Sequence, residues 1–334
     1  MEGAGKIHTW HDILKEIIED PHQKQRIAQE MHIHPLTLAR WANKEAKPRE
    51  GNIRQLLKII PHNMLNIFIQ LLSTDFPSLA QTLDLPTNSS PELPSAIYVQ
   101  VLNASAQTPE ALRPDGIYNL ILQQAIKHLD PHHLGMAISI VQCMPPAHGT
   151  QVRSLREIAG IGTPPWKRDL ERKMLFLGVE SLAGAAVTKC HLIVVHRREE
   201  PLSFAHWTTY EQSAVACPIR SSTKIMGSLL VASAYPHYFT ETHLALIEHY
   251  ANLSALAFEP EDFYESKDIA LRLMPHDTIQ QLYFHNLRHR ITQKLMEATA
   301  AVRHLTLQQA QQQVWQEIEE ELLQRALDGR IEPL

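Results

Sequence analysis

Glycine and cysteine are scarce in this sequence, and both shortages exclude classes of protein. Only 12 of the 334 residues are glycine, which argues against a Gly-rich nucleotide-binding enzyme. The three cysteines, Cys143, Cys190 and Cys217, are an odd number, widely spaced and without a CxxC pair. That pattern argues against a disulfide framework and a structural zinc site. Small buried residues are the favoured interpretation of all three, with redox sensing as the alternative.

Long apolar runs and catalytic motifs are missing as well. No stretch approaches the roughly 18 apolar residues that span a bilayer. Residues 1–10 lack the apolar core of a signal peptide, so a cytoplasmic location is expected. No GxxxxGK[ST], HExxH, GxSxG or strand-linked GxGxxG motif occurs. Clustered histidines such as His132-His133 have no partner cluster at metal-ligand spacing. The sequence therefore predicts no catalytic residues, no metal and no cofactor, and a protein that is not an enzyme.

Charge, by contrast, is present and unevenly distributed. The whole chain has a net charge of −5, yet the stretch from Pro21 to Pro61 holds eight basic and three acidic residues. That stretch thus carries +5 and the remainder carries −10. A small basic module on an acidic body suggests contact with a polyanion, although a solvated surface would have the same composition.

Apolar residues at helical spacing predict four short helices near the N-terminus. They cover residues 10–19, 21–31, 35–44 and 52–60. Only residues 32–34 separate the second helix from the third, so these two must cross steeply. Ala28 lets the two axes approach, and Ile33, Leu38 and Trp41 fill the angle between them. The opposite face of the third helix is left outside, where it fits the major groove of B-DNA.

The residues Arg26-Ile27-Ala28-Gln29-Glu30-Met31-His32-Ile33-His34-Pro35-Leu36-Thr37-Leu38-Ala39-Arg40-Trp41 resemble the helix-turn-helix of the Cro/lambda-repressor-like (XRE) family. The resemblance covers residues 8–72. It departs from the family at His32, where glycine is usual, and at His34, where a Ser or Thr cap is usual. The resemblance implies base-edge contacts from Pro35, Leu36, Thr37, Ala39 and Arg40, and phosphate contacts from Lys44, Lys47 and Arg49. The alternative is a helical module that docks on protein.

A stretch rich in Pro, Ser, Thr and Asn over residues 73–95 predicts a linker. Beyond it the pattern predicts a mixed α/β domain over residues 96–262. Helices are expected at 94–106 and 117–128, strands at 135–143 and 192–196, a hairpin of 213–220 with 225–233, and a helix from 240 to 258. Residues 145–165 are interpreted as irregular and 167–189 as mostly helical.

This order of elements resembles the GAF family of small-molecule sensors. The resemblance lies in Glu180-Ser181-Leu182-Ala183-Gly184-Ala185-Ala186-Val187, Leu192-Ile193-Val194-Val195, and the segments 213–219, 225–233 and 239–247. It implies an antiparallel sheet, and it leaves the ligand open. Trp166, Phe176, His191, His206, Trp207 and Tyr210 fall on segments that would roof this sheet. They are the candidate ligand-binding residues. Aromatic residues that merely close a core are the alternative.

Residues 263–334 are expected to be helical. Ile291, Leu295, Ala298, Val302 and Leu305 recur at coiled-coil-like spacing. Self-association and packing back onto the sensor are both compatible with that stripe. Taken together, the sequence predicts a cytoplasmic, homodimeric transcriptional regulator that binds double-stranded DNA and senses a small molecule. The alternative is a GAF-like signalling scaffold whose N-terminal module docks on protein.

Overall fold

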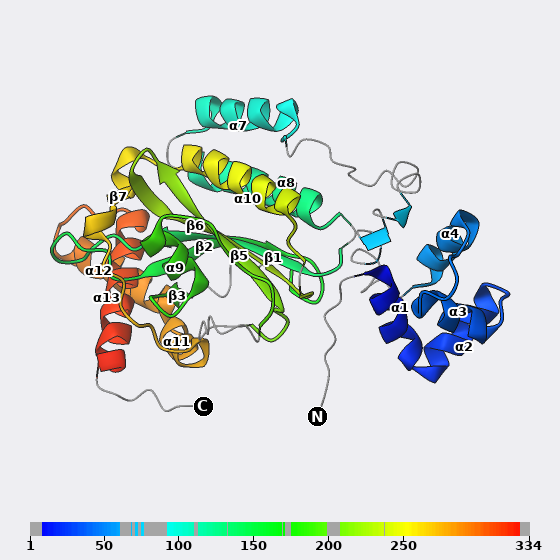
Figure 1. The fold of residues 1–334 in the computed structure, drawn as a ribbon. Helices are drawn as coiled ribbons and strands as arrows, with labels where there is room; N and C mark the ends of the chain where they lie inside the picture. The colour runs from blue at the N-terminus through cyan, green and yellow to red at the C-terminus, as the bar shows by residue number, and fades with distance from the viewer. Residues whose placement is uncertain are drawn as a thin grey trace. The chain divides into compact units, whose positions relative to one another are not determined.

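The computed structural model describes residues 9–60, 68, 71–72, 75–76, 92–109, 113–131, 133–168, 170, 175–198, 208–236 and 238–327. The chain divides into two compact units, Met1–Ser90 and Pro91–Leu334 (Figure 1). Across the described ranges, no helix combines the length and hydropathy that a membrane span requires.

The first unit confirms the four predicted helices. They are α1 (Trp10–Glu19), α2 (Pro21–Glu30), α3 (Pro35–Ala42) and α4 (Glu50–Ile59). Their apolar stripes meet in one core, which includes Trp10, Leu14, Ala28, Leu38 and Trp41. Phe68, Leu72 and Phe76 belong to the same core, and the Trp10 indole Nε1 donates to Asp75 Oδ2 at 2.8 Å. The first unit therefore extends at least to residue 76, beyond the predicted end at residue 72.

An antiparallel sheet organises the second unit, as predicted. Its strands are β1 (Met136–Cys143), β2 (Leu155–Gly162), β3 (Phe176–Leu177), β4 (Ile193–Val195), β5 (Ser213–Ser221), β6 (Lys224–Ser233) and β7 (Tyr264–Glu265). The order is β3-β2-β1-β6-β5-β4, with β7 paired to β6. In the register at the centre, Ser139 of β1 lies opposite Gly160 of β2 and Leu230 of β6.

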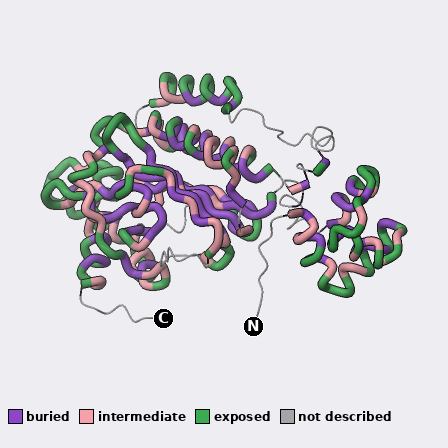
Figure 2. The backbone as a smooth tube through the Cα atoms, in the orientation of Figure 1, coloured by how far each residue is buried: buried purple, intermediate pink, exposed green. Residues whose placement is uncertain are grey.

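Successive side chains of each strand point to opposite faces of the sheet, and both faces are buried beneath helices. Ile138 and Ile140 point to a cluster formed with α7 (Ser95–Gln107), α8 (Arg113–Leu129) and α10 (Glu241–Ser254). Ala137 and Val141 point to the other face, which α9 (Leu182–Lys189) covers. Figure 1 shows α8 and α10 side by side over one face of the sheet, with α7 outside them. The buried residues follow the strands in Figure 2.

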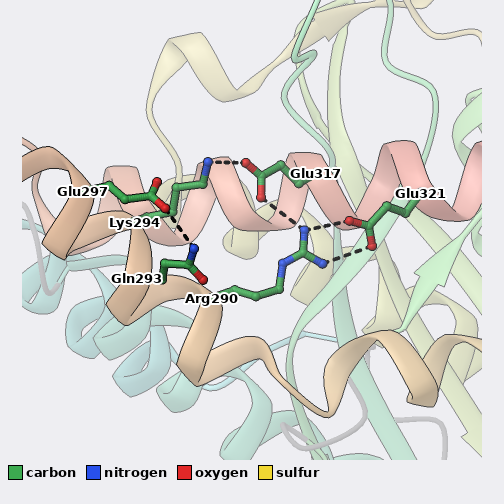
Figure 3. Close-up of polar contacts among 6 residues, drawn as sticks. All are labelled: Arg290, Gln293, Lys294, Glu297, Glu317 and Glu321. Carbon is green, nitrogen blue, oxygen red and sulfur yellow. Dashed lines mark hydrogen bonds and ion pairs between the residues drawn. The ribbon is translucent and has the colours of Figure 1, made fainter.

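Three helices form the C-terminal part of the second unit: α11 (Asp277–Phe284), α12 (Leu287–Ala300) and α13 (Leu307–Leu327). Val314, Ile318 and Leu322 of α13 are fully buried in a cluster with Phe176 of the edge strand β3. Arg290 of α12 pairs with Glu317 and Glu321 of α13 (Figure 3). Of the predicted stripe, Ile291 is buried in the same cluster and Leu295 and Leu305 are half-buried against it, whereas Val302 is 94 % exposed. Part of the stripe therefore packs within its own chain.

Two predictions about the middle of the chain are wrong. Residues 145–165 are not wholly irregular, because β2 runs through them. Of residues 167–189, the described part (167–168, 170 and 175–189) contains β3 and a single short helix, α9. The pairing register shifts between Ile140 and Val141, so Ile158 is an extra residue that breaks the alternation of β2. A strand with a bulge and two glycines has no regular period-2 pattern to detect.

Candidate functional sites

The turn between α2 and α3 has a defined hydrogen-bonded geometry. His32 N–H donates to Gln29 O at 3.1 Å, and Ile33 N–H donates to Ala28 O at 3.0 Å. This pair of bonds is a Schellman motif, which requires a left-handed residue at the position of His32. The φ angle of His32 is indeed +52°, although the residue is not glycine. The turn therefore forms with histidine in the left-handed position.

His34 caps the start of the third helix. It is the N-cap of α3, and its Nδ1 accepts a hydrogen bond of 3.3 Å from the backbone N–H of Leu36. Pro35 follows at the first helical position, where a backbone N–H would have no partner within the helix. Its missing N–H therefore costs no hydrogen bond. Both ends of the turn are therefore satisfied locally, and α3 begins where the sequence predicts.

The outward face of α3 carries the predicted DNA-contacting residues. Leu36 is 62 % exposed and Arg40 is exposed, whereas Leu38 and Trp41 on the opposite face are buried. Pro35, Thr37 and Ala39 are half-buried, while Lys44, Lys47 and Arg49 are exposed. Lys44 (φ +63°) closes a second Schellman motif, with Glu45 N–H donating to Arg40 O at 2.8 Å. The turn after α3 therefore has a defined backbone geometry, and the basic side chains lie on this turn and just beyond it.

One of these basic residues also has a structural contact. The Lys47 ammonium lies 4.9 Å from the centroid of the Phe76 ring. An exposed cation over an aromatic ring contributes about 0.5–1 kcal/mol. The contact with Phe76 holds the Lys47 side chain near its own unit. Of the residues predicted to contact phosphate, Lys47 is therefore the least free to reach DNA.

In the second unit, the sheet face that α9 covers is lined by small side chains. They are Ala137, Ser139, Gly160, Gly162, Ala214, Ala216 and Ala232. The two glycines let the segment after β2 lie directly on the sheet. A Cβ on Gly160 would come within 3.0 Å of Leu170 Cβ, and one on Gly162 within 2.6 Å of Lys167 O. Residues 166–168 and Leu170 therefore form a cover over this face.

Asp130 anchors the start of that cover. Its buried carboxylate accepts hydrogen bonds from the backbone N–H groups of Leu134 and Gly135 and from Thr163 Oγ1, at 2.7, 3.2 and 2.5 Å. Thr163 Oγ1 also accepts from the Met136 N–H at 2.8 Å. The carboxylate therefore joins the end of α8, the start of β1 and the segment that leads to Trp166.

Two carboxylates lie on or beside the same face. Ser139 Oγ donates to Glu157 Oε1 at 3.1 Å, and Glu211 is only 7 % exposed. The Thr208 N–H donates to Glu211 Oε2 at 3.1 Å. Burial raises the pKa of Glu211 to about 7, the negative charge of Glu157 adds to the rise, and Arg198 opposes it. A carboxyl that titrates near neutrality beside a second carboxylate suits recognition of a polar ligand group.

The predicted ligand residues do not all gather at this face. Trp166 is buried there, and the Tyr210 ring meets it edge-on at 5.9 Å. Phe176 instead packs against Trp315 of α13, with ring centroids 5.8 Å apart, because β3 is the edge that α13 covers. His191 is exposed after α9, with Nδ1 2.9 Å from Lys189 O. His206 and Trp207 lie outside the described residues.

Sequence reasoning missed Ser139, Glu157 and Glu211. None of them belongs to a motif, and a single glutamate before a strand gives no recognisable signal. Only the register that sets Ser139 near β2 brings the hydroxyl and the Glu157 carboxylate together.

The thiols and histidines have no metal-site geometry in the part of the chain that the structure describes, where no three potential metal ligands cluster. All three cysteines are free, and Cys143 and Cys217 are buried. Burial raises the pKa of the Cys143 thiol and raises that of Cys217 to about 12. These two thiols are accordingly poor nucleophiles at neutral pH.

Among the comparisons with known proteins, solved structures alone match the chain. No family model and no curated protein matches the chain. A type II free methionine-R-sulfoxide reductase from Thermoplasma acidophilum is 18 % identical, with a TM-score of 0.32, over 50 % of this chain and 99 % of that chain. The GAF domain of an Acinetobacter phosphoenolpyruvate-protein phosphotransferase is 13 % identical, with a TM-score of 0.35, over 49 % and 90 %.

A free methionine-R-sulfoxide reductase from Neisseria meningitidis is 14 % identical, with a TM-score of 0.34, over 48 % of this chain and 85 % of that chain. The second unit has the antiparallel sheet and covering helices that the sequence predicts. Identities and TM-scores at this level transfer no activity to this chain.

The prediction that the chain is not an enzyme is wrong as it was argued. It rested on missing motifs, whereas several of the matched solved structures are reductases. The absence of the four motifs excludes only the enzyme classes that carry them.

Proposed function

We propose that the first unit is an XRE-type helix-turn-helix that binds double-stranded DNA, and that the GAF-like unit senses a small molecule and adjusts this binding. The protein would act as a transcriptional regulator. The observation that carries the proposal is the arrangement of α3, which buries Leu38 and Trp41 and exposes Leu36 and Arg40.

The physical fit to duplex DNA follows from that arrangement. A helix presented on a unit's surface can enter the major groove, where Arg pairs with guanine and apolar groups contact the thymine methyl. Arg40 and Leu36 offer these two chemistries on one face. Lys44 and Arg49 follow the helix and are exposed, which suits contacts to the phosphates on either side of a groove.

A gel-shift series on the full-length chain tests the DNA-binding proposal. The probe is the duplex upstream of the chain's own coding sequence, with a scrambled duplex of equal length as competitor. We expect selective binding that falls by about 1–3 kcal/mol in Arg40→Ala. Lys15→Ala is the matched control, since Lys15 is an exposed lysine of α1 in the same unit.

Two outcomes contradict DNA binding by α3. One is equal loss of affinity in Arg40→Ala and Lys15→Ala. The other is that neither the upstream duplex nor a random-sequence duplex library is shifted, while a protein partner is found to bind the first unit. That second outcome would support the docking alternative.

The sensing part of the proposal rests on the side chains gathered at the edge of the sheet face of small residues that α9 and residues 166–168 cover. Trp166 and Tyr210 supply aromatic surface there, and Glu157 and Glu211 supply carboxylates. Native mass spectrometry of the purified chain would detect a co-purifying ligand. We expect a ligand mass bound to the wild type. Ser139→Leu places a larger side chain on the face and should remove this mass, whereas Ser105→Leu, at a half-buried position of α7, should retain it. A bound mass that both variants retain would place the ligand elsewhere.

A further inference from the structure

Arg156 of β2 is a positive charge without a counter-ion among the residues that the structure describes. Its guanidinium Nε is buried and has no hydrogen-bond partner. No described oxygen accepts a hydrogen bond from Arg156 or forms an ion pair with it. Burial lowers the pKa of Arg156 to about 10, and the phenol of Tyr118 opposes this decrease. The side chain therefore stays charged at neutral pH, in surroundings that do not compensate the charge.

One face of this guanidinium rests on an aromatic ring. Arg156 lies opposite Phe176 of β3 in the sheet, and its Cζ is 4.6 Å from the centroid of the Trp315 ring on α13. Trp315 is held in place, because it is buried and its ring meets that of Phe176 edge-on. A cation–π contact recovers part of the cost of removing a charge from water, and it uses the face of the guanidinium rather than its N–H groups. The N–H groups along the edge therefore remain available to an acceptor.

The acidic residues of α13 are engaged by other cations. Arg290 pairs with two of them, as Figure 3 shows, and Arg153 pairs with two more; they are Glu317, Glu321, Glu319 and Glu320. The part of α13 that precedes Trp315, residues 307–314, contains no acidic residue in its sequence. The helix that stacks on Arg156 thus supplies a ring and no anion.

Acidic residues on neighbouring elements have other partners as well. Gln142, which lies opposite Arg156 on β1, donates from Nε2 to Asp262 Oδ1 at 3.5 Å. On α8, Tyr118 Oη donates to Asp115 Oδ1 at 2.6 Å. The elements around Arg156 therefore carry carboxylates, and the contacts of these carboxylates are made with other residues.

We propose that Arg156 and Trp315 form a binding subsite for an oxyanion, the carboxylate or phosphate group of a small ligand. A guanidinium offers its N–H donors in a planar fork that matches both groups and binds them through two parallel hydrogen bonds. Stacking on Trp315 fixes the plane of the fork before the anion arrives, so little side-chain freedom is lost on binding. A bound anion would also supply the counter-charge that the described residues do not.

The subsite is reached from a different side of the sheet than the face of small residues. Arg156 is half-buried, so part of its side chain reaches solvent. Glu157 follows it in the strand and therefore points to the opposite face, where it accepts from Ser139. Gln311 and Gln312 lie one turn before Trp315 and are exposed, so uncharged amide donors share its side of α13. The inference thus goes beyond the proposed sensing face and uses none of its residues.

Thermal unfolding of the full-length chain tests the subsite with two probes, sodium phosphate and sodium acetate, each compared with sodium chloride at equal ionic strength. An anion that binds the folded state raises Tm as its concentration increases. We expect such a rise in the wild type, and the anion that produces it distinguishes a phosphate from a carboxylate ligand. Arg156→Met should raise the apparent Kd at least about tenfold, and Arg156→Lys, which keeps the charge without the fork, should give an intermediate value. Arg303→Gln removes an exposed arginine of the same unit and is the control.

Tryptophan fluorescence gives a second readout of the same titrations. Anion binding beside Trp315 should change the emission of the wild type, and Trp315→Phe, which keeps a ring beneath the guanidinium, should lose this change while phosphate or acetate still raises Tm. Circular dichroism checks that each variant is folded, and Arg156→Lys carries the comparison if Arg156→Met is not.

Two results overturn the subsite. One is that neither anion raises Tm of the wild type above its value in chloride. The other is that Arg156→Met and Arg303→Gln weaken anion binding equally. Ser139→Leu alters the opposite face and should leave anion binding unchanged, so a loss in that variant alone would also reject the site at Arg156. None of these results bears on DNA binding by α3, so the subsite and the proposed function fail separately.

Discussion

Ser154 and Glu319 are joined by a buried hydrogen bond, in which Ser154 Oγ donates to Glu319 Oε1 at 2.6 Å. The two residues are 0 % and 1 % exposed. Ser154 immediately precedes β2 and Glu319 lies on α13, so this bond fastens the last helix to the sheet. Arg153 reaches the same carboxylate at 3.6 Å and pairs with Glu320 at 2.8 Å. Burial raises the pKa of Glu319, while the serine and arginine oppose the rise.

Removing the serine hydroxyl should therefore leave a buried carboxylate short of a donor. We expect Ser154→Ala to lower the free energy of unfolding by about 2 kcal/mol in urea denaturation at neutral pH. Glu319→Gln should reduce this cost, because an amide needs less solvation than a carboxylate. If the Ser154→Ala and Glu319→Gln effects simply add, the two groups do not interact as the structure shows.

Glu211 gives a dependence on pH with a definite sign. Its pKa is about 7 in the folded chain, against 4.5 for the free side chain. The folded state thus binds the proton more tightly than the unfolded state. The stabilisation that Glu211 contributes is therefore fully present below pH 4.5 and is lost as pH rises through 7. The full loss amounts to about 3 kcal/mol. Denaturation of wild type and Glu211→Gln at pH 5 and pH 8 should show the variant gaining relative stability at pH 8. Parallel changes in both proteins would refute this titration.

His32 occupies a left-handed backbone position, with φ of +52°, that glycine adopts without strain. His32→Gly should stabilise the first unit by about 1 kcal/mol, measured as slower hydrogen exchange of the amides of α2 and α3. Gln25→Gly is the matched control. It places the same residue in the exposed interior of α2 and should accelerate exchange. Acceleration in both variants would argue against the left-handed turn.

Asp130 should be among the most sensitive polar residues of the second unit. Asp130→Ala removes the acceptor of three hydrogen bonds and should cost about 3 kcal/mol, measured by thermal unfolding. Asp115→Ala serves as the comparison. Asp115 is exposed and accepts one bond, from Tyr118 Oη at 2.6 Å, so it should cost far less. Equal losses would mean that Asp130 does not anchor Thr163.

Sequence patterns predict elements well where one apolar stripe determines them. The four N-terminal helices, β1 and the β5–β6 hairpin fall within two residues of their predicted bounds. Prediction fails where tertiary contacts override the local pattern. β2 is interrupted by the bulge at Ile158, and β3 has only two residues, with Gln280 of α11 bonding both backbone groups of Phe176. No local signal in the sequence marks that amide as the partner of an edge strand.

The candidate sites follow the same rule. The α3 face was predictable because its residues are consecutive and helical spacing separates Arg40 from the buried Trp41. The face beneath α9 was not, because Ser139, Glu157 and Glu211 come from segments whose proximity depends on the strand register. Aromatic content alone suggested Phe176, which packs against the C-terminal helices instead.

The salt dependence of DNA binding tests the central claim most directly, because it counts phosphate contacts. Fluorescence anisotropy on the upstream duplex gives the affinity of the full-length chain as salt increases. A phosphate contact from Lys44 predicts that Lys44→Ala lowers the slope of log affinity against log salt by about 1, while Lys15→Ala leaves it unchanged. An identical slope in wild type and Lys44→Ala, or no salt-dependent binding at all, would contradict DNA recognition by the α3 face.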